Sequence, residues 1–315
     1  MLRRYLAKRL LIAVPSLLIA SLIVFTLPRL LPGDAVQLML AEKAYAKDVD
    51  ELRAKLGLDR PLAVQYVEWL GRVAQGDLGE SLWTRRPVLQ ELGQRLPITL
   101  ELAFFALAFA LLIALPVGVI SAARADTLQD YLARSAAIVG LSVPGFWLAT
   151  LLIVLPAIWW GWRPLIEFTE FSKNPLAHVA QFLIPALILG VAAGAALMRL
   201  TRSMLLEVLR QDYVRTAWAK GLAERVIVLK HGLRNAIIPV VTLLGTQLPQ
   251  IIGGTVIIET VFGRPGVGRL VVGAILNKDF PLVQGVVLFV AIAYVFINLA
   301  VDIIYAFADP RIHYG

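Results

Sequence analysis

The side chains best suited to chemistry gather in one basic stretch, residues 213–239 (YVRTAWAKGLAERVIVLKHGLRNAIIP). Its single acid is Glu224, and the histidine His231 lies near its middle. Charge of this density must face water, lipid headgroups or the surface of a partner. The stretch therefore predicts a binding surface, and its cations are Arg215, Lys220, Arg225, Lys230 and Arg234.

Catalytic and metal-binding arrangements are not apparent in the rest of the sequence. The histidines His178, His231 and His313 are far apart and lack metal-ligand spacing. The chain contains no cysteine, which excludes disulfides, thiolate metal sites and cysteine nucleophiles. The glycine-rich segment 263–269 lacks the Gly-Lys-Ser/Thr ending of a phosphate-binding loop, and we interpret it as a structural turn. We expect no catalytic residue, no bound cofactor and no metal site in this chain.

The composition indicates where such a basic stretch must be held. Of the 315 residues, 59% are hydrophobic and only 17% are charged, against about 25% charged in ordinary soluble domains. This excess of apolar residues is too large for one soluble core. The formal net charge of +8 is typical of a membrane protein that keeps Lys and Arg on its cytoplasmic side.

Six apolar runs are long enough to cross a bilayer core of about 30 Å. Prolines inside them, such as Pro116 and Pro185, are tolerated in membrane bundles because neighbouring helices and waters can satisfy the freed backbone groups. The sequence therefore predicts an all-α polytopic membrane protein, with spans at residues 10–30, 98–122, 133–160, 179–198, 236–258 and 282–307. The third run is interrupted by Pro144-Gly145.

The distribution of Lys and Arg predicts the orientation of these spans. The N-terminal segment and residues 199–234 are rich in cations, whereas the connections 161–178 and 259–281 are nearly balanced. The positive-inside rule puts the first two in the cytoplasm, together with both chain ends. Residues 31–97 then lie outside as a small folded cap, with short helices near 48–56 and 61–75 and a turn at 76–79.

The basic stretch falls in the cytoplasmic loop, 199–235, between the fourth and fifth predicted spans. Its first half has helical periodicity, Asp212 can cap the helix and Gly221 can end it. From these residues alone, the helix could lie on anionic lipid, belong to a solvated basic loop, or dock on a cytoplasmic protein.

Recognisable motifs occur along nearly the whole chain. One loop contains Asp212-Tyr213-Val214-Arg215-Thr216-Ala217, Ala219-Lys220-Gly221-Leu222 and His231-Gly232-Leu233-Arg234-Asn235-Ala236. These motifs are similar to the coupling-loop signature of ABC importer permease subunits, specifically those of the dipeptide/oligopeptide/nickel class. Other matching motifs are Leu31-Pro32-Gly33-Asp34, Gly76-Asp77-Leu78-Gly79 with Ser81, Ser142-Val143-Pro144, and Glu259-Thr260-Val261-Phe262 with Pro265-Gly266-Val267-Gly268. Trp218 departs from the pattern, since the class often has Arg there.

The resemblance implies a type I ABC importer permease fold and a role for the helix at 213–222 in coupling to a cytoplasmic ATPase. Ala217 and Gly221 would allow close approach, and nearby cations would meet polar or acidic rims. The residues implied in coupling are Tyr213, Arg215, Thr216, Ala217, Lys220, Gly221, Leu222 and Arg234. Pro239 would mark the re-entry of the chain into the membrane.

The resemblance also implies the assembly around this chain. It would pair with a second homologous permease subunit, two ATP-binding subunits that hold ATP and Mg, and an extracytoplasmic solute-binding protein, in the inner membrane of a prokaryote. ATP hydrolysis is expected in those partners, so this chain is a transport subunit and not an enzyme. It would divide into span 1 (1–30), a periplasmic cap (31–97) and a transmembrane core (98–315).

Polar side chains inside spans are costly unless they face a cavity or another helix, so they are candidates for the translocation path. The fifth span carries Thr242, Thr246, Gln247 and Gln250 largely on one face; the alternative is hydrogen bonding between helices. The substrate implied is a di- or oligopeptide, with nickel complexes, glutathione, opines or oligosaccharides as alternatives. A stand-alone secondary transporter agrees less well with the sequence, because such transporters usually have internal repeats and an ionisable residue at mid-span, and the sequence shows no clear repeat and no acid there.

Overall fold

The computed structural model describes residues 2–29, 60–162 and 168–308, and their regular structure is helical apart from one β-bridge between Glu80 and Pro87. This agrees with the all-α prediction. The elements are α1 (Leu2–Thr26), η1 (Leu27–Arg29), α4 (Leu62–Ala74), α5 (Val88–Ala123), α6 (Leu128–Ser142), α7 (Gly145–Trp160), α8 (Pro175–Leu209), α9 (Asp212–Ala219), α10 (Glu224–Val226), η2 (Ile227–Leu233), α11 (Arg234–Val261), α12 (Val267–Leu276) and α13 (Phe280–Ala308).

The predicted spans correspond to helices of the structure. Among the described residues, four helices are long and apolar enough to cross a membrane: α5, α8, the continuous helix Glu224–Val261, and α13 over Phe280–Val301. They contain the second, fourth, fifth and most of the sixth predicted spans. The first predicted span corresponds to α1, whose apolar part, Leu11–Thr26, is shorter than the other four.

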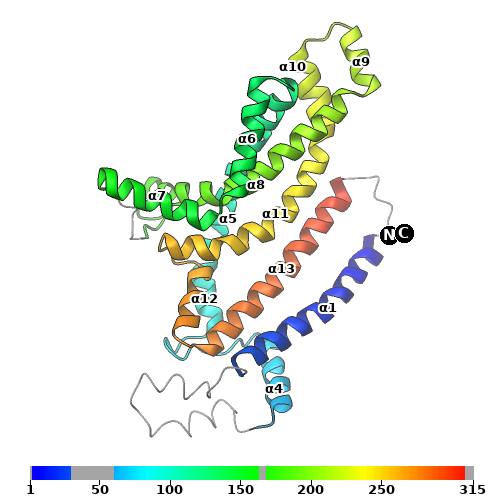
Figure 1. Ribbon diagram of the computed structural model, residues 1–315. Coiled ribbons are helices and arrows are strands. Elements are labelled where there is room, and N and C mark those ends of the chain that lie inside the picture. The colour runs from blue at the N-terminus through cyan, green and yellow to red at the C-terminus, as the bar shows by residue number, and fades with distance from the viewer. Residues whose placement is uncertain (1, 30–59, 163–167, 309–315) are drawn as a thin grey trace. The chain divides into compact units, whose positions relative to one another are not determined.

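The third predicted span is broken. Helices α6 and α7 meet at an angle of 96° instead of forming one rod with an interruption, and Figure 1 shows α7 turning away from α6. Val143 is extended (φ −85°, ψ 120°) because the proline ring at Pro144 disfavours helical backbone in the preceding residue. The pair therefore forms either a broken span or a re-entrant segment.

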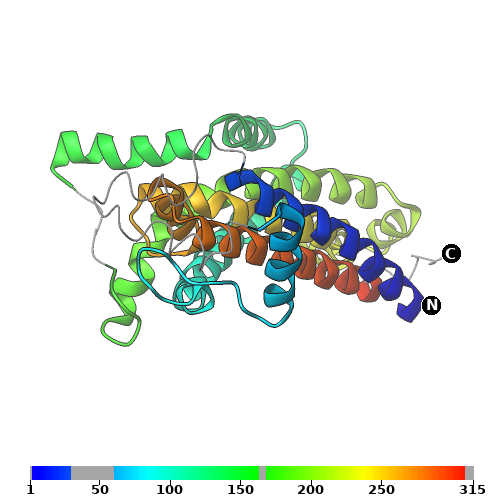
Figure 2. The same cartoon turned by 90° about the horizontal axis from the view of Figure 1, so that it is seen from below.

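The chain divides into two compact units, which we describe separately. The first contains residues 1–97 and 266–299. In it α4 packs beside α1 through the ring cluster of Phe25, Tyr66 and Trp69, and the amide of Gln284 in α13 donates to the carbonyl of Phe25 at 3.3 Å. Figures 1 and 2 both show α1 and α13 running side by side.

The second unit contains residues 98–265 and 300–313. Its core is built from α5, α8 and α11 with many small residues. A Cβ added at Gly190 of α8 would lie only 2.6 Å from the carbonyl oxygen of Ala106, and one at Gly194 would lie 3.3 Å from the Cα of Ala110. Small residues let helix backbones approach closely, as membrane helix pairs require.

Part of the predicted cap can be compared with the structure. The helix predicted at 61–75 is present as α4, and the predicted turn at 76–79 is present with Gly76 and Gly79 at φ +85° and +88°. The helix predicted at 48–56 lies outside the described residues. The compact units group residues 266–299 with 1–97, and the periplasmic location of the cap remains a prediction.

Candidate functional site

Helix α9 lies at the centre of the basic stretch, where the sequence predicts a helix at 213–222. It covers Asp212–Ala219, and Gln211, not Asp212, occupies the N-cap position, without a side-chain cap. The helix ends as predicted at a glycine. Gly221 adopts φ +72°, and Leu222 N–H bonds back to the carbonyl of Ala217 at 3.4 Å. A left-handed residue at this position is the usual way to end a helix, and glycine adopts it without steric cost.

One face of α9 is fixed onto the chain. Val214 and Ala217 are buried and pack with Ile227 and Leu209. The small side chain of Ala217 thus serves close packing inside this chain, whereas the sequence-based expectation gave it a contact with a partner. The other predicted coupling residues near α9 are exposed: Tyr213, Arg215, Thr216, Lys220, Gly221 and Leu222, together with Trp218.

A π-helical segment follows α9. Residues Ile227–Leu233 form η2, which joins α10 to α11 without a break in the helix. Helical hydrogen bonding of this type is rare and occurs mostly as single turns, often at functional sites. Pro239 therefore lies inside a helix that begins at Glu224, and its position as the point where the chain re-enters the membrane stays a prediction.

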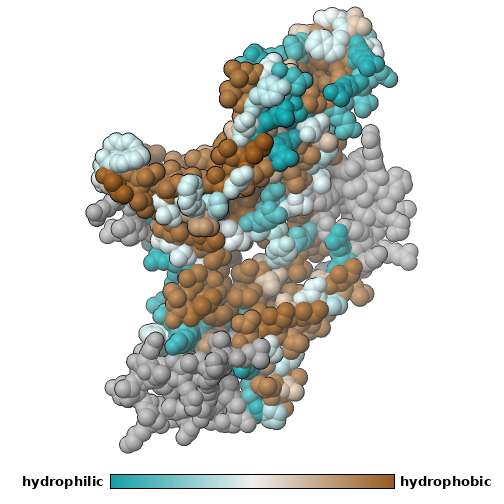
Figure 3. Space-filling view, viewed as in Figure 1, coloured by the Kyte–Doolittle hydropathy of each residue, from teal (hydrophilic) through white to brown (hydrophobic). Residues whose placement is uncertain are grey.

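Two hydrogen bonds connect α9 to η2 and to the start of α11. The Asn235 amide donates to the Tyr213 hydroxyl at 2.8 Å, and that hydroxyl donates to the His231 carbonyl at 3.3 Å. Tyr213 and Asn235 belong to separate parts of the signature recognised in the sequence. Their contact joins residues 22 positions apart in the sequence, so α9 is bonded to the helix that contains the fifth predicted span. Figure 3 shows hydrophilic surface gathered over this end of the molecule, around α9 and α10.

The candidate path residues occupy an incompletely buried face of α11. Thr242, Thr246 and Gln250 are exposed and Gln247 is partly exposed. The two threonine hydroxyls bond to helix carbonyls, Ile238 O at 3.1 Å and Leu243 O at 2.8 Å. Polar side chains exposed along a membrane helix require an aqueous path or a partner helix, so the placement is compatible with both alternatives.

A buried carboxylate lies toward the same end of the unit as α9. Asp130, fully buried in the first turn of α6, accepts two hydrogen bonds of 2.7 Å from the guanidinium of Arg202 in α8. It also accepts from the Ser121 hydroxyl at 2.5 Å and the Asp126 N–H at 3.0 Å. Sequence reasoning missed this cluster. The available signal was an acid and an arginine, each close to the end of an apolar run.

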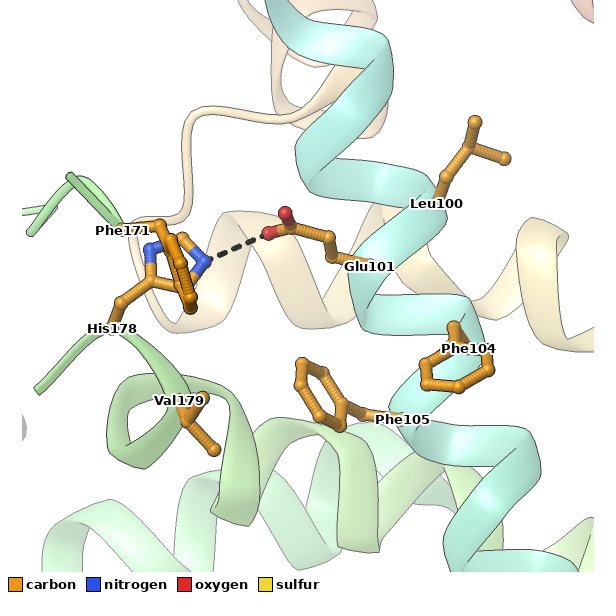
Figure 4. Close-up of a pocket in the computed structure, with 7 residues that line it drawn as sticks. All are labelled: Leu100, Glu101, Phe104, Phe105, Phe171, His178 and Val179. Carbon is orange, nitrogen blue, oxygen red and sulfur yellow. Dashed lines mark hydrogen bonds and ion pairs between the residues drawn. The ribbon is translucent and has the colours of Figure 1, made fainter. Parts of the chain in front are cut away.

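The opposite end of α8 carries a second polar cluster. The His178 ring is buried, with Nδ1 2.8 Å from the Thr169 carbonyl and Nε2 3.0 Å from a carboxylate oxygen of Glu101. Because a backbone carbonyl can only accept, the contact with Thr169 makes Nδ1 the donor, and Nε2 faces the Glu101 carboxylate. Figure 4 shows this pair at the rim of a cavity of about 320 Å³, lined also by Leu100, Phe104, Phe105, Phe171 and Val179.

Gln181 extends this cluster into the interior. Its carbonyl oxygen accepts from the Arg264 guanidinium at 2.5 Å and from the Thr169 N–H at 3.2 Å, and its amide donates to the Thr169 carbonyl at 2.8 Å. Arg264 is almost fully buried and belongs to the segment 263–269, which we interpreted as a structural turn. The observed bonds agree with that interpretation. Within the described part of the chain, no group of three or more potential metal ligands is present.

Comparison with known families identifies the protein class. Residues 114–314 match the family described as binding-protein-dependent transport system inner membrane component, and residues 1–103 match the N-terminal family of the same membrane components. The chain belongs to this family and is a permease subunit of an ABC importer. It is therefore a multi-pass protein of the inner membrane.

Individual relatives are similar over nearly their full length. A putative peptide transport system permease protein of Brucella suis is 42% identical over 307 residues, which cover 98% of each chain. The glutathione transport system permease protein GsiC of Salmonella typhimurium is 39% identical over 310 residues, covering 98% of this chain and 99% of the relative.

Solved structures support the fold. An inward-facing form of the MetNI methionine ABC transporter matches 70% of this chain and 97% of its own, with a TM-score of 0.56 at 19% identity. A crystal structure of an amino acid ABC transporter with histidines has a TM-score of 0.54 at 15% identity and covers 71% of this chain. The fold is that of a type I importer permease, as the sequence predicted.

Proposed function

We propose that this permease subunit imports short peptides, and that the exposed face of α9 couples the transport path to a cytoplasmic ATP-hydrolysing subunit. The observation that carries the proposal is the two-sided character of α9. Val214 and Ala217 fix one face to the chain, while Arg215 and Trp218 remain exposed on the other. Arginine and tryptophan are enriched among the residues that carry binding energy at protein interfaces.

The contacts around α9 support a route for the motion. Displacement of α9 reaches α11 through the Tyr213–Asn235 hydrogen bond and the packing against η2. The face of α11 that carries Thr242, Thr246, Gln247 and Gln250 would then turn toward or away from the substrate path. Such rigid-body transmission needs an element that both sites bias, and the helix Glu224–Val261 with its π segment is that element.

The assembly that we propose places α9 and both chain ends in the cytoplasm. A second homologous permease subunit completes the path, and two ATP-binding subunits hold ATP and Mg and carry out hydrolysis. A solute-binding protein delivers the substrate from the other side of the membrane. The family match supports ATPase and binding-protein partners in general, and this stoichiometry is the arrangement that the experiment below assumes.

The coupling role is tested in the complete complex, reconstituted in proteoliposomes. The measured quantity is the ATPase rate with and without substrate-loaded binding protein, for the wild type and for the double variant Arg215→Ala/Trp218→Ala. We expect the stimulated increment to fall at least about tenfold while the subunits stay assembled, because hot-spot side chains at interfaces contribute about 2 kcal/mol or more. Stimulation equal to that of the wild type would reject coupling through α9.

A matched control separates docking from local charge pairing. Arg215 lies 3.4 Å from Asp212, and both side chains are largely exposed. Exposed pairs of this kind contribute about 0–1 kcal/mol. Asp212→Asn removes the pair but leaves Arg215 available to a partner, so it should keep the stimulated rate.

The substrate class rests on the relatives named for peptide transport. Glutathione is a second candidate, because GsiC relatives align over 98% of this chain. Uptake of radiolabelled dialanine and of radiolabelled glutathione by the same proteoliposomes distinguishes the two. Accumulation of dialanine that unlabelled glutathione does not compete would support the peptide assignment, and the reverse pattern would favour glutathione.

A further inference from the structure

The cavity beside Glu101 and His178 has a lining that is almost entirely apolar. Its volume is about 320 Å³, and five of its seven lining residues are leucine, valine or phenylalanine (Figure 4). The two polar residues, Glu101 from α5 and His178 from α8, lie together at the rim. Apolar pockets of this size with a few convergent polar groups are typical small-molecule sites. The cavity therefore suits a ligand with an apolar body and one polar end.

The polar end of that ligand must suit a carboxylate. One oxygen of Glu101, Oε2, lies 3.0 Å from Nε2 of His178, and Nδ1 of that ring is held by the Thr169 carbonyl at 2.8 Å. Within the described part of the chain the other oxygen, Oε1, has no partner, and 42% of the side chain is exposed. An ionised carboxylate only accepts hydrogen bonds. Glu101 therefore selects a cationic donor such as an ammonium group.

Aromatic rings around the carboxylate favour the same kind of group. The Phe171 ring stands at 90° to the His178 ring, with centroids 5.6 Å apart, and the residues Phe104 and Phe171 are 67% and 59% exposed. The faces of aromatic rings attract cations that lie within about 6 Å of their centres. An ammonium group bonded to Glu101 is thus placed beside aromatic surface as well as beside a carboxylate.

The position of Glu101 and His178 along the chain puts the cavity at a membrane surface. Glu101 is the fourth residue of the apolar run 98–122, and His178 directly precedes the run 179–198. The helices that contain these runs, α5 and α8, are long and apolar enough to cross a bilayer. The ends of such runs lie at the level of the lipid headgroups. Both headgroups and acyl chains are therefore within reach of this cavity.

The surface around the cavity is apolar and separate from the proposed substrate path. Leu100 is 49% exposed, and Leu176, in the first turn of α8, is 81% exposed. Exposed apolar surface of this kind marks sites of membrane contact. The described residues that line the cavity come from α5, α8 and the segment before α8, whereas the candidate path residues lie on α11. A lipid is thus a better occupant than the transported substrate.

We propose that this cavity binds a phospholipid whose headgroup ends in a primary ammonium group. The ammonium group donates to Glu101, and the apolar lining contacts the upper part of an acyl chain. His178 is a positioning residue, because it contacts the carboxylate and holds its orientation. A choline headgroup has the same charge but no N–H to donate, so the site distinguishes the two headgroups.

The test uses the complete transporter, delipidated in detergent, and measures lipid binding by native mass spectrometry. The probes are dioleoyl phosphatidylethanolamine and dioleoyl phosphatidylcholine, which differ only in the headgroup amine. We expect one site in this chain to bind the ethanolamine lipid about tenfold or more tightly than the choline lipid. Glu101→Gln should weaken the ethanolamine lipid at that site about tenfold or more, as expected for the loss of a hydrogen bond between charged groups.

Two further variants make the result specific. Glu170→Gln removes a neighbouring exposed carboxylate, which pairs with Lys173 at 3.6 Å and does not line the cavity. This variant should bind the ethanolamine lipid as the wild type does. Val179→Phe places a ring in the cavity without a change of charge, and it should lose the tight site for the ethanolamine lipid. The thermal midpoint without added lipid reports that each variant complex is folded.

Three results would overturn the proposal. Equal binding of the ethanolamine lipid by the wild type and Glu101→Gln would remove the role of the carboxylate. Equal affinity for the two lipids would show that the ammonium group is not recognised. Displacement of the bound lipid by excess dialanine would assign the cavity to the amino terminus of a peptide substrate. Coupling through α9 is independent of all three results, since the ATPase measurement tests it separately.

Discussion

The two ends of helix α8 are fixed in different ways. Near the end that continues into α9, one fully buried carboxylate, Asp130, receives both hydrogen bonds from Arg202. At the end that begins the helix, the polar contacts are distributed. Glu101 contacts His178 at 3.0 Å, and 42% of the Glu101 side chain is exposed. The buried hydrogen bond of this cluster is the one that Gln181 accepts from Arg264.

The two ends therefore differ in burial: the Asp130 carboxylate is fully buried, whereas the Glu101 carboxylate is partly exposed. We call Asp130 with its partners Ser121 and Arg202 the Asp130 clamp; it joins α5, α6 and α8 near the end of α8 that precedes α9. The Glu101–His178 pair lies at the rim of a cavity (Figure 4), and its Glu101 carboxylate is in contact with solvent. We therefore expect substitutions to lower stability most at the Asp130 clamp, less at buried Gln181, and least at Glu101 on the rim of the cavity.

Removal of the carboxylate at the clamp should have the largest effect. Asp130→Ala leaves Arg202 without its buried counter-charge, and breaking a buried pair in this way costs about 3–5 kcal/mol. We expect a large drop in the thermal midpoint of the purified complex, measured by fluorescence-detected size exclusion, or failure to assemble.

The double variant Asp130→Leu/Arg202→Met is the matched control. It replaces both charges by apolar groups, an exchange that is often neutral in stability. It should recover most of the lost stability. A double variant that is as unstable as Asp130→Ala would show that the hydrogen bonds to Ser121 and Asp126 matter more than the pairing.

Removal of the Gln181 amide, which lies at the centre of the polar cluster with His178 and Arg264, should have the next largest effect. Gln181→Met keeps the length of the side chain but deprives Arg264 and both backbone groups of Thr169 of a partner. Hydrogen bonds to charged groups contribute about 1.5–3 kcal/mol, so a loss of that size is expected in the same thermal assay. Gln181→Glu, which keeps the acceptors for Arg264 and the Thr169 N–H, should cost less.

Overpacking beside the clamp comes third. A Cβ at Gly118 would lie 2.8 Å from the Cβ of Thr201 and 3.0 Å from the carbonyl of Met198. Gly118→Val should therefore lower stability by about 1–3 kcal/mol. The control is Gly93→Val on the same helix α5, where a Cβ meets no atom within 4 Å. Equal loss for both variants would mean that helix propensity, and not packing, decides the result.

The smallest effect is expected at the rim. Glu101→Gln keeps the shape of the side chain and removes its charge next to His178. Because the carboxylate is 42% exposed, we expect a change within about 1 kcal/mol. A loss as large as that of Asp130→Ala would remove the distinction between the buried and the partly exposed end of α8.

The sequence was most informative where a property is local. The helix at 61–75, the glycine that ends α9 and the apolar runs follow from periodicity, backbone preference and length, which neighbouring residues determine. The break at Pro144 was visible as an interruption, but its angle of 96° depends on what α6 and α7 pack against. The N-cap assigned to Asp212 was wrong by one residue, since helix ends are the least certain feature of such patterns.

The parts of the site that could not be predicted join distant residues. Asp130 and Arg202 are 72 positions apart, Gln181 and Arg264 are 83 apart, and Glu101 and His178 are 77 apart. No periodicity relates such pairs. The π segment is equally hidden, because its residues Ile227–Leu233 have no composition that separates them from ordinary helix.

The sequence by itself determined the membrane class, the family and the position of the basic helix α9, because apolar length, Lys/Arg bias and ordered motifs are properties of the chain in one dimension. Only the tertiary structure decided which face of α9 is available. Burial of Ala217 and Val214 against Ile227 turns the helix so that Arg215 and Trp218 face outward. The physical reason is that a buried polar or charged group must find its partners in space, and the folded backbone alone sets which distant residues are within hydrogen-bond distance.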